Sequence, residues 1–235
     1  MSNYVYGKLT ALNSIDSKQA KTIYIQRDFS DKKILDLAQK NRIHINYVNN
    51  VELNKLAKGG NHQGIVVDVE EYQYSTLDEI IQAAKNKTQP LILILDGIND
   101  PHNLGAIIRS ADAFSVDGII IKNRNQVPVN MTVSKVSTGA INYVKIAQVS
   151  NLSNAIEKLK KEGYWIYSAD GSGKDDYSKL SYDGKVCLVM GSEGEGISNL
   201  VLRNSDFIMK IPMTGHVNSL NVSVATGIIL SRIRN

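Results

Sequence analysis

The sequence is poor in residues that build several common kinds of protein site. Its 235 residues include one cysteine, four prolines and one tryptophan. A single thiol excludes a disulfide framework and a cysteine-ligated zinc site. Because Cys187 lies in the apolar run VCLVM, we expect this thiol to be buried and inert. No metal-ligand spacing occurs among the histidines, so we predict no metal site; they are His44, His62, His102 and His216.

Long hydrophobic runs and a strong charge imbalance are also lacking. No apolar run approaches the roughly 18 residues that span a bilayer, and the start MSNYVYGK has no signal-peptide core. We therefore expect a cytoplasmic protein without a membrane partner. Lysine and arginine number 27 against 23 aspartates and glutamates, a net charge of +4. This balance permits an anionic partner such as nucleic acid without requiring one.

Several catalytic and cofactor motifs have no match in the chain. There is no GxGxxG fingerprint, no phosphate-binding loop with its Lys-Ser/Thr pair, and no GxSxG nucleophile elbow. A dinucleotide-dependent oxidoreductase is therefore a remote alternative.

What the chain does contain is alternating strand and helix patterns of an α/β protein. Residues 1–71 form a first small α/β unit, with an opening turn and helix, a helix capped by Ser30, and strands at 22–26, 44–49 and 64–70. Residues 72–89 are polar and are interpreted as a linker and docking helix.

Residues 90–235 predict a second, larger α/β domain. Pro90 is followed by LILILD, a continuous apolar run typical of a parallel strand buried on both faces. Further strands are expected at 118–122, 143–149, 164–170, 185–191 and 206–211, with helices between most of them. We predict an open, mostly parallel sheet whose ligand site lies beyond the carboxyl ends of the strands.

The first of three polar strand ends follows LILILD. Asn103 precedes or opens a helix, either as its N-cap or as a site residue. Arg109 lies on that helix among Leu104, Ile107 and Ile108, so it is expected to have a dedicated anionic partner.

The second strand end is LVMGSEGEGIS. Its glycines, beginning with Gly191, allow the backbone to approach a ligand closely or adopt positive φ. Glu193 fits a cationic or hydroxyl-bearing ligand better than a phosphate, or else serves as a helix cap.

The third strand end is KIPMTGHVNSLNVSVATGIIL, where strand turns into a small-residue helix. Either Ser219 or Asn221 can cap that helix, whose free N–H groups and dipole attract polar partners. From the residues alone, the three strand ends predict a polar, nucleotide-like pocket.

Together these stretches resemble the SpoU (TrmH-like) branch of the SPOUT RNA methyltransferases. NDPHNLGAIIRSADAF, LVMGSEGEGIS and IPMTGHVNSLNVSVATGIIL are similar to the family's three motifs, in the same order. VYGKLTAL and HQGIVV resemble the L30e-like substrate-binding domain that precedes the catalytic domain in enzymes methylating a guanosine ribose of large-subunit rRNA.

The resemblance implies a C-terminal trefoil knot, a homodimer through the C-terminal domain, and methyl transfer from S-adenosylmethionine to a ribose 2′-hydroxyl of 23S rRNA. It further implies two sets of site residues. The polar catalytic set is Asn103, Arg109, Glu193, Ser219 and Asn221, and the cofactor set is Thr138, Gly139, Ala140, Gly191, Ile211 and Leu220.

Two other functions fit the same fold. One is ribose 2′-O-methylation of tRNA, and the other is a non-catalytic RNA-binding factor in ribosome assembly. Intact Asn103, Arg109 and Asn221 argue against the second.

Overall fold

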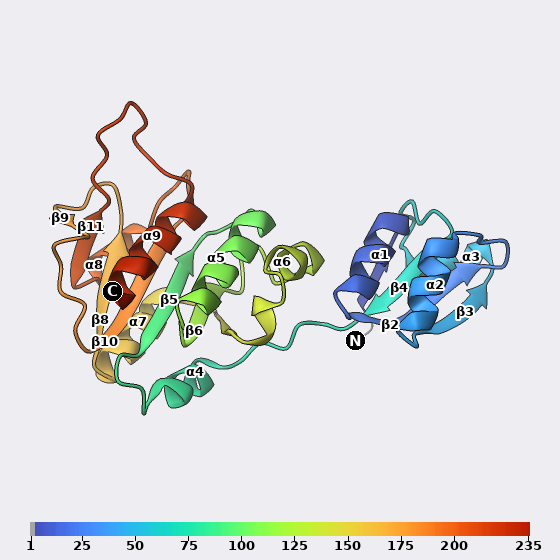
Figure 1. The fold of residues 1–235 in the computed structure, drawn as a ribbon, viewed down its shortest axis with the longest axis horizontal. Coiled ribbons are helices and arrows are strands. Elements are labelled where there is room, and N and C mark those ends of the chain that lie inside the picture. The colour runs from blue at the N-terminus through green and yellow to red at the C-terminus, as the bar shows by residue number, and fades with distance from the viewer. Residues whose placement is uncertain (1–2) are drawn as a thin grey trace. The chain divides into compact units, whose positions relative to one another are not determined.

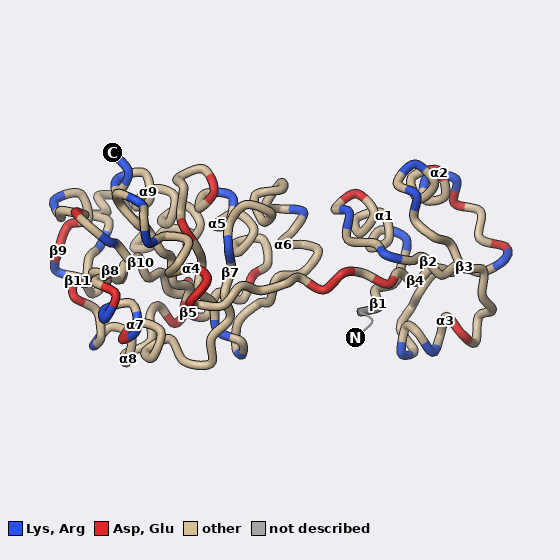
Figure 2. Tube along the Cα trace, turned by 90° about the horizontal axis from the view of Figure 1, so that it is seen from below, with Lys and Arg blue, Asp and Glu red and all other residues tan. Residues whose placement is uncertain are grey.

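The chain divides into two units, Met1–Gln73 and Tyr74–Asn235, of which the computed structural model describes residues 3–235 (Figure 1). Most of the stretch interpreted as a linker, from Tyr74 onward, belongs to the second unit. Lysine and arginine are interspersed with aspartate and glutamate along both units (Figure 2). Neither unit therefore carries charged residues of one sign alone along its chain.

The first unit contains a four-stranded mixed sheet in the order β1-β4-β2-β3. Strands β2 and β3 are parallel, whereas β4 runs antiparallel to both β1 and β2. The elements are β1 (Asn3–Tyr6), α1 (Lys8–Asp16), β2 (Ala20–Gln26), α2 (Lys32–Lys40), β3 (His44–Val48), α3 (Asn50–Leu56) and β4 (Ile65–Val69).

Two sequence-based predictions for this unit are wrong in detail. The opening turn is strand β1, where pairing with the distant strand β4 holds Asn3–Tyr6 extended. The N-cap of α2 is Asp31 and not Ser30, since the Asp31 side chain accepts the Ile34 N–H. Either residue type can cap a helix, so composition alone did not decide between neighbours.

The second unit contains a seven-stranded sheet in the order β7-β6-β5-β10-β8-β11-β9, with every pairing parallel. Its strands are β5 (Leu91–Asp96), β6 (Gly118–Lys122), β7 (Lys145–Val149), β8 (Tyr164–Ala169), β9 (Asp175–Asp176), β10 (Lys185–Gly191) and β11 (Phe207–Lys210). The predicted parallel sheet is confirmed, while the short strand β9 was not among the predicted strands.

Helices cover both faces of this sheet. They are α4 (Leu77–Ala84), α5 (Pro101–Ala113), α6 (Met131–Val136), the 3-10 turn η1 (Ala140–Asn142), α7 (Leu152–Lys161), α8 (Asn199–Arg203) and α9 (Val222–Arg234). Figure 1 shows α5 and α9 in front of the strands. On the other face, Ile92 and Ile94 pack with Ile80 of α4 and Ile156 of α7. Truncating such a fully buried side chain to alanine costs about 2–5 kcal/mol.

The strand order reverses between β5 and β10. From β5 the chain proceeds outward through β6 to β7, then returns to β8 on the far side of β10. Ligands of open parallel sheets bind beyond the carboxyl ends of the strands, at such a reversal. The loops that follow β5, β10 and β11 all lie at this edge, and they are the three polar strand ends of the sequence.

Candidate functional site

A cluster of three polar side chains joins the three strand ends. Asn221 donates through Nδ2 to Asn103 Oδ1 at 2.9 Å and to Glu193 Oε1 at 2.5 Å. Asn103 donates through Nδ2 to the same Glu193 oxygen at 3.4 Å. Residues separated by up to 118 positions in the sequence are thus brought into one hydrogen-bonded group.

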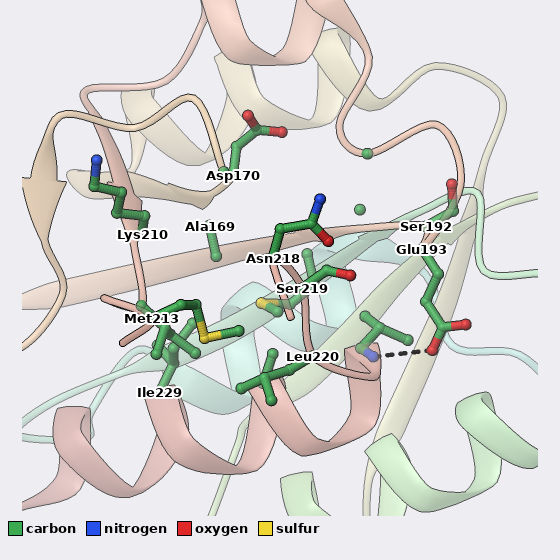
Figure 3. A pocket seen from close by; sticks show the side chains of 17 residues that line it. Ala169, Asp170, Ser192, Glu193, Lys210, Met213, Asn218, Ser219, Leu220 and Ile229 are labelled. Atoms are coloured by element: carbon green, nitrogen blue, oxygen red, sulfur yellow. Dashed lines mark hydrogen bonds between the residues drawn. The ribbon is translucent and has the colours of Figure 1, made fainter. Parts of the chain in front are cut away.

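Local helix chemistry holds this cluster in place. Asn221 is the N-cap of α9, and its Oδ1 accepts the Ser223 N–H at 2.9 Å. Glu193 Oε1 also accepts the Val222 N–H at 3.2 Å, the bond dashed in Figure 3. The carboxylate therefore lies at the positive end of the α9 dipole, where an anion is stabilised by about 0.3–1 kcal/mol.

The alternatives that the sequence left open are resolved differently for each residue. Asn103 is not an N-cap, because Asp100 caps α5 by accepting the His102 N–H at 2.8 Å. Asn221, and not Ser219, caps α9. Glu193 does serve a helix start, since it accepts an N–H of α9, but it simultaneously binds the two asparagines.

Beside the cluster lies a cavity of about 220 Å³ at the carboxyl ends of β8, β10 and β11. Figure 3 shows Met213, Leu220 and Ile229 on its apolar side and Asp170 and Lys210 across from them. Such a cavity offers an apolar surface for a flat ring and polar groups for the rest of a nucleoside-like ligand.

Gly191 is required for the shape of this cavity. A Cβ on Gly191 would lie 2.2 Å from the carbonyl carbon of Gly196, because the loop after β10 turns back across the strand end. Ser192 and Gly196 close that turn with backbone hydrogen bonds in both directions, at 3.0 and 3.1 Å. Any side chain at position 191 would force this loop out of place.

The predicted cofactor residues divide into two groups. Gly191, Ile211 and Leu220 all line the cavity, together with Ser219 and Glu193 of the predicted catalytic set. Thr138, Gly139 and Ala140 follow α6 and are not among the lining residues of the cavity. Thr138 and Gly139 have positive φ values of 49° and 92°, and Ala140 is buried. Cofactor contacts by either group stay predictions.

Arg109 lies apart from the asparagine–glutamate cluster. It follows Asn103 by six residues on α5, a rotation of about 240° around the helix axis, so the two side chains leave different faces. Arg109 is exposed, and no hydrogen bond or ion pair joins it to any residue of 3–235. The predicted anionic partner of Arg109 does not lie within residues 3–235 and stays a prediction, and the guanidinium is open to an external anion.

Asp170 and Lys210 are cavity residues that sequence reasoning missed. The Asp170 carboxylate accepts the Ser172 N–H at 2.9 Å and the Ser172 hydroxyl at 2.6 Å. Burial acts to raise the pKa of Asp170, but the hydrogen bonds from Ser172 outweigh it and lower the pKa below its usual value. Its position at the end of a predicted strand was the available signal, obscured by the turn-like sequence that follows.

Other expectations concern groups outside the cavity. Cys187 is fully buried in β10, which confirms the predicted burial, and burial raises the pKa of its thiol. Within residues 3–235, no three side chains of the His, Cys, Asp and Glu types gather as a metal site would require. No helix in that range has the length and apolar character to cross a membrane.

The fold and the site define an α/β protein with a cavity suited to a nucleoside-like ligand at the carboxyl ends of its parallel strands. Residues 90–231 match the SpoU rRNA Methylase family, and residues 4–75 match the family described as RNA 2′-O ribose methyltransferase substrate binding. The chain therefore belongs to the SpoU rRNA methylase family of RNA methyltransferases.

A named relative and two solved structures resemble this chain over nearly its whole length. The Bacillus subtilis protein "Putative TrmH family tRNA/rRNA methyltransferase YacO" is 39% identical over 236 residues, which cover 98% of this chain and 94% of that protein. The AdoMet-bound rRNA methyltransferase from Sinorhizobium meliloti aligns with a TM-score of 0.67 and 26% identity, over 99% of this chain and 87% of that one. The SpoU methyltransferase AviRb from Streptomyces viridochromogenes, in complex with AdoMet, shares the fold at a TM-score of 0.68 and 22% identity, over 99% and 89% of the chains.

Proposed function

We propose that this protein transfers the methyl group of S-adenosylmethionine to a ribose 2′-hydroxyl of RNA, and that the target is a guanosine of 23S rRNA. The observation that carries the proposal is the Asn103–Glu193–Asn221 cluster at the edge of the 220 Å³ cavity. A cofactor in the cavity would place its reactive end beside polar groups suited to a hydroxyl.

The lining of the cavity fits S-adenosylmethionine. Met213, Leu220 and Ile229 provide an apolar surface for the adenine ring, and the Asp170 carboxylate provides an acceptor for a hydroxyl or ammonium group. When bound, the cofactor supplies an activated methyl group: its S–CH₃ bond breaks as the O–CH₃ bond forms, leaving S-adenosylhomocysteine, a 2′-O-methyl ribose and a released proton.

The protein's own contribution is alignment and charge stabilisation. Asn103 and Asn221 hold each other and Glu193, and from this rigid group they orient the hydroxyl toward the cavity. Arg109 is exposed on α5 and binds an RNA phosphate, for which its planar fork is suited. A guanidinium with a pKa above about 12 is a poor general base, so we assign Arg109 no proton-accepting role.

The proposal includes the finer features that the family resemblance implies. These are the trefoil knot formed by the C-terminal segment, the L30e-like character of the first unit, a homodimer through the C-terminal domain, and a cytoplasmic location. The segment between β11 and α9, residues 211–221, supports a knot because it is long and irregular, and it supplies cavity residues as a threaded segment would.

Methyl transfer to separate RNA classes tests the proposal. The full-length protein is incubated with methyl-labelled S-adenosylmethionine and 23S rRNA, 16S rRNA or tRNA from a strain lacking its gene, and the products are digested to nucleosides and mapped. We expect label in 2′-O-methylguanosine of 23S rRNA, and none with an Asn103→Ala variant that still binds the cofactor.

Other outcomes select the alternatives. Label confined to tRNA would show that the substrate is tRNA and not rRNA. The name of the B. subtilis relative, which gives both tRNA and rRNA, leaves this outcome open. Absence of label in all three RNAs, together with absence of cofactor binding by calorimetry, would support a non-catalytic RNA-binding factor.

A further inference from the structure

A second, polar cavity adjoins the cofactor cavity, with which it shares Ser192 and Gly196. It measures about 720 Å³ and lies at the carboxyl ends of β5 and β6 and beneath the loop that follows β10. The side chains relevant to binding are Asn99, Lys122, Asn125, Glu195 and Asn199. None of these five lines the cofactor cavity.

A smaller cavity of about 310 Å³ connects the two regions. It shares Asn99 and Glu195 with the polar cavity, and it is also lined by Asn103 and Glu193 of the cluster. A ligand bound at the cluster can therefore extend directly into the polar cavity. The polar cavity is therefore a candidate space for the base of a ribose bound at Asn103.

The floor of the polar cavity is a fixed ion pair. Lys122 Nζ lies 2.8 Å from Asp96 Oδ1, and the other Asp96 oxygen accepts the Ser198 N–H at 2.9 Å. Asp96 is 3% exposed. Burial acts to raise the pKa of Asp96, but the bonds from Lys122 and Ser198 outweigh it and lower the pKa, so the Asp96 carboxylate stays charged at neutral pH.

This ion pair orients donors toward the ligand. A lysine ammonium has three donors, and Asp96 uses one of them, which leaves two for a ligand in the cavity. Gln126 holds the neighbouring loop, because its Oε1 accepts the Gly97 N–H at 3.2 Å and the Lys122 N–H at 3.3 Å. Asn125, with φ of 54°, is presented from that loop.

Glu195 supplies a negatively charged hydrogen-bond acceptor to the same cavity. Its backbone N–H is bound to Ser192 Oγ at 3.2 Å, so the residue's position is set while its carboxylate is exposed. The cavity therefore combines a positively charged donor with a negatively charged acceptor. Among RNA bases, guanine offers both the acceptor pair O6 and N7 for an ammonium and two adjacent donors, N1–H and N2–H, for a carboxylate.

We propose that the polar cavity binds the base of the methylated nucleotide and selects guanine, with Lys122 donating to O6 or N7 and Glu195 accepting from N1–H and N2–H. This inference rests on the proposed methyl transfer to a ribose. It assigns base discrimination to the second unit itself, so specificity does not depend on RNA binding by the first unit alone.

The test combines a substitution in the protein with removal of the 2-amino group from the target guanine of the RNA. The site is first mapped as described above, and a short RNA hairpin carrying it is synthesised with guanosine, inosine or adenosine at the target position. Inosine lacks only the 2-amino group. We measure kcat/KM of the full-length wild-type protein, of Glu195→Gln, and of Glu157→Gln, an exposed charge-matched control on α7.

For wild type and the control we expect inosine to lower kcat/KM by about tenfold or more, the effect of losing a hydrogen bond to a charged group. Glu195→Gln should lower kcat/KM on guanosine by a similar factor, and inosine should then cost less than about threefold further, because the carboxylate that read the amino group is gone. Cofactor affinity by calorimetry should be unchanged in each variant.

A second variant probes the cavity without changing its charge. Asn125→Gly removes a lining side chain and tolerates the positive φ of 54°, and it should lower kcat/KM on the guanosine hairpin while leaving cofactor affinity intact. Lys122 is not substituted, since the buried Asp96 carboxylate would lose its partner.

Failure of the inference is distinguishable from failure of the proposed function. Methylation of a ribose whose base is not guanine, or equal sensitivity of wild type and Glu195→Gln to inosine, overturns the base assignment while methyl transfer stands. Absence of any 2′-O-methyl product overturns both.

Discussion

Replacing Asn221 by aspartate separates two tasks that this side chain performs. As N-cap of α9, its Oδ1 accepts the Ser223 N–H, and aspartate caps a helix as well as asparagine does. As a donor, its Nδ2 binds Asn103 and Glu193. Asn221→Asp therefore keeps the cap, removes both donated bonds and places a carboxylate against the Glu193 carboxylate.

The expected destabilisation follows from these contacts. A lost hydrogen bond to a charged group costs about 1.5–3 kcal/mol, and two like charges about 4 Å apart repel by about 1 kcal/mol in bulk water. Glu193 and Asn221 are exposed. Water can therefore hydrogen-bond to Glu193 in place of Asn221, which reduces the cost of the lost hydrogen bond. We expect a net cost of about 2–3 kcal/mol at pH 7, which corresponds to roughly 4–12 °C in Tm for a unit of this size.

The pH dependence of the stability of Asn221→Asp tests whether repulsion between the two carboxylates causes the destabilisation. Repulsion from Glu193 disfavours the charged form of the introduced carboxyl, so it acts to raise the folded-state pKa above the level that the cap bonds from Ser223 alone would give. A raised folded-state pKa favours folding at low pH, and that advantage is lost as pH rises through the folded-state value. The deficit of Asn221→Asp should thus be full at pH 7 and shrink as pH falls toward 4.

Thermal unfolding of Asn221→Asp and Asn221→Ser at pH 7 and pH 4 provides the assay. Serine also caps a helix but introduces no charge, so the difference between the two variants isolates the carboxylate pair. Equal Tm values at pH 7, or a difference that persists unchanged at pH 4, would refute the reasoning.

Three further predictions concern separate parts of the second unit. Gly191→Ala should abolish measurable cofactor binding by calorimetry, because its Cβ would lie 2.2 Å from the Gly196 carbonyl carbon; unchanged affinity would contradict the cavity geometry. Arg109→Lys should lower kcat/KM for RNA by about tenfold or more while cofactor affinity is unchanged, because lysine lacks the guanidinium fork; retention of most of the wild-type rate at every pH of a pH–rate profile would count against this role. Cys187 should resist a thiol reagent in the folded protein at pH 8 and react only upon unfolding, since burial raises its pKa; rapid labelling of native protein would show that β10 is accessible.

Patterns of apolar and polar residues predicted the elements whose structure follows from their own sequence. LILILD is a fully buried central strand, as its uninterrupted apolar run indicated. The short strand β9 was not predictable, because its sequence is Asp-Asp and only pairing with β11 makes it a strand. Strand order is likewise set by contacts distant in sequence, so the reversal between β5 and β10 could not be derived from the patterns themselves.

The candidate site shows the same division. Polar residues after strands predicted that Asn103, Glu193 and Asn221 would meet, and they do. Their hydrogen-bond roles depended on exact helix starts, which shift by one or two residues without changing composition. The apolar neighbours of Arg109 in sequence occupy other faces of the helix, so their burial did not predict that the arginine itself is exposed.

The attachment of Glu193 to the start of α9 has a consequence for when the protein acquires its site. The strands that carry Asp96 and Gly191 are made well before residues 222–234, and at about 5–20 residues per second the ribosome adds that helix last among the elements of the site. Until α9 has emerged, Glu193 and Asn103 lack Asn221 and the Val222 N–H, and Ala225 and Ile229 are missing from the cavity wall. A nascent chain can therefore possess most of its parallel sheet while having no assembled site, so RNA near the translating ribosome does not meet an active protein before this helix is in place.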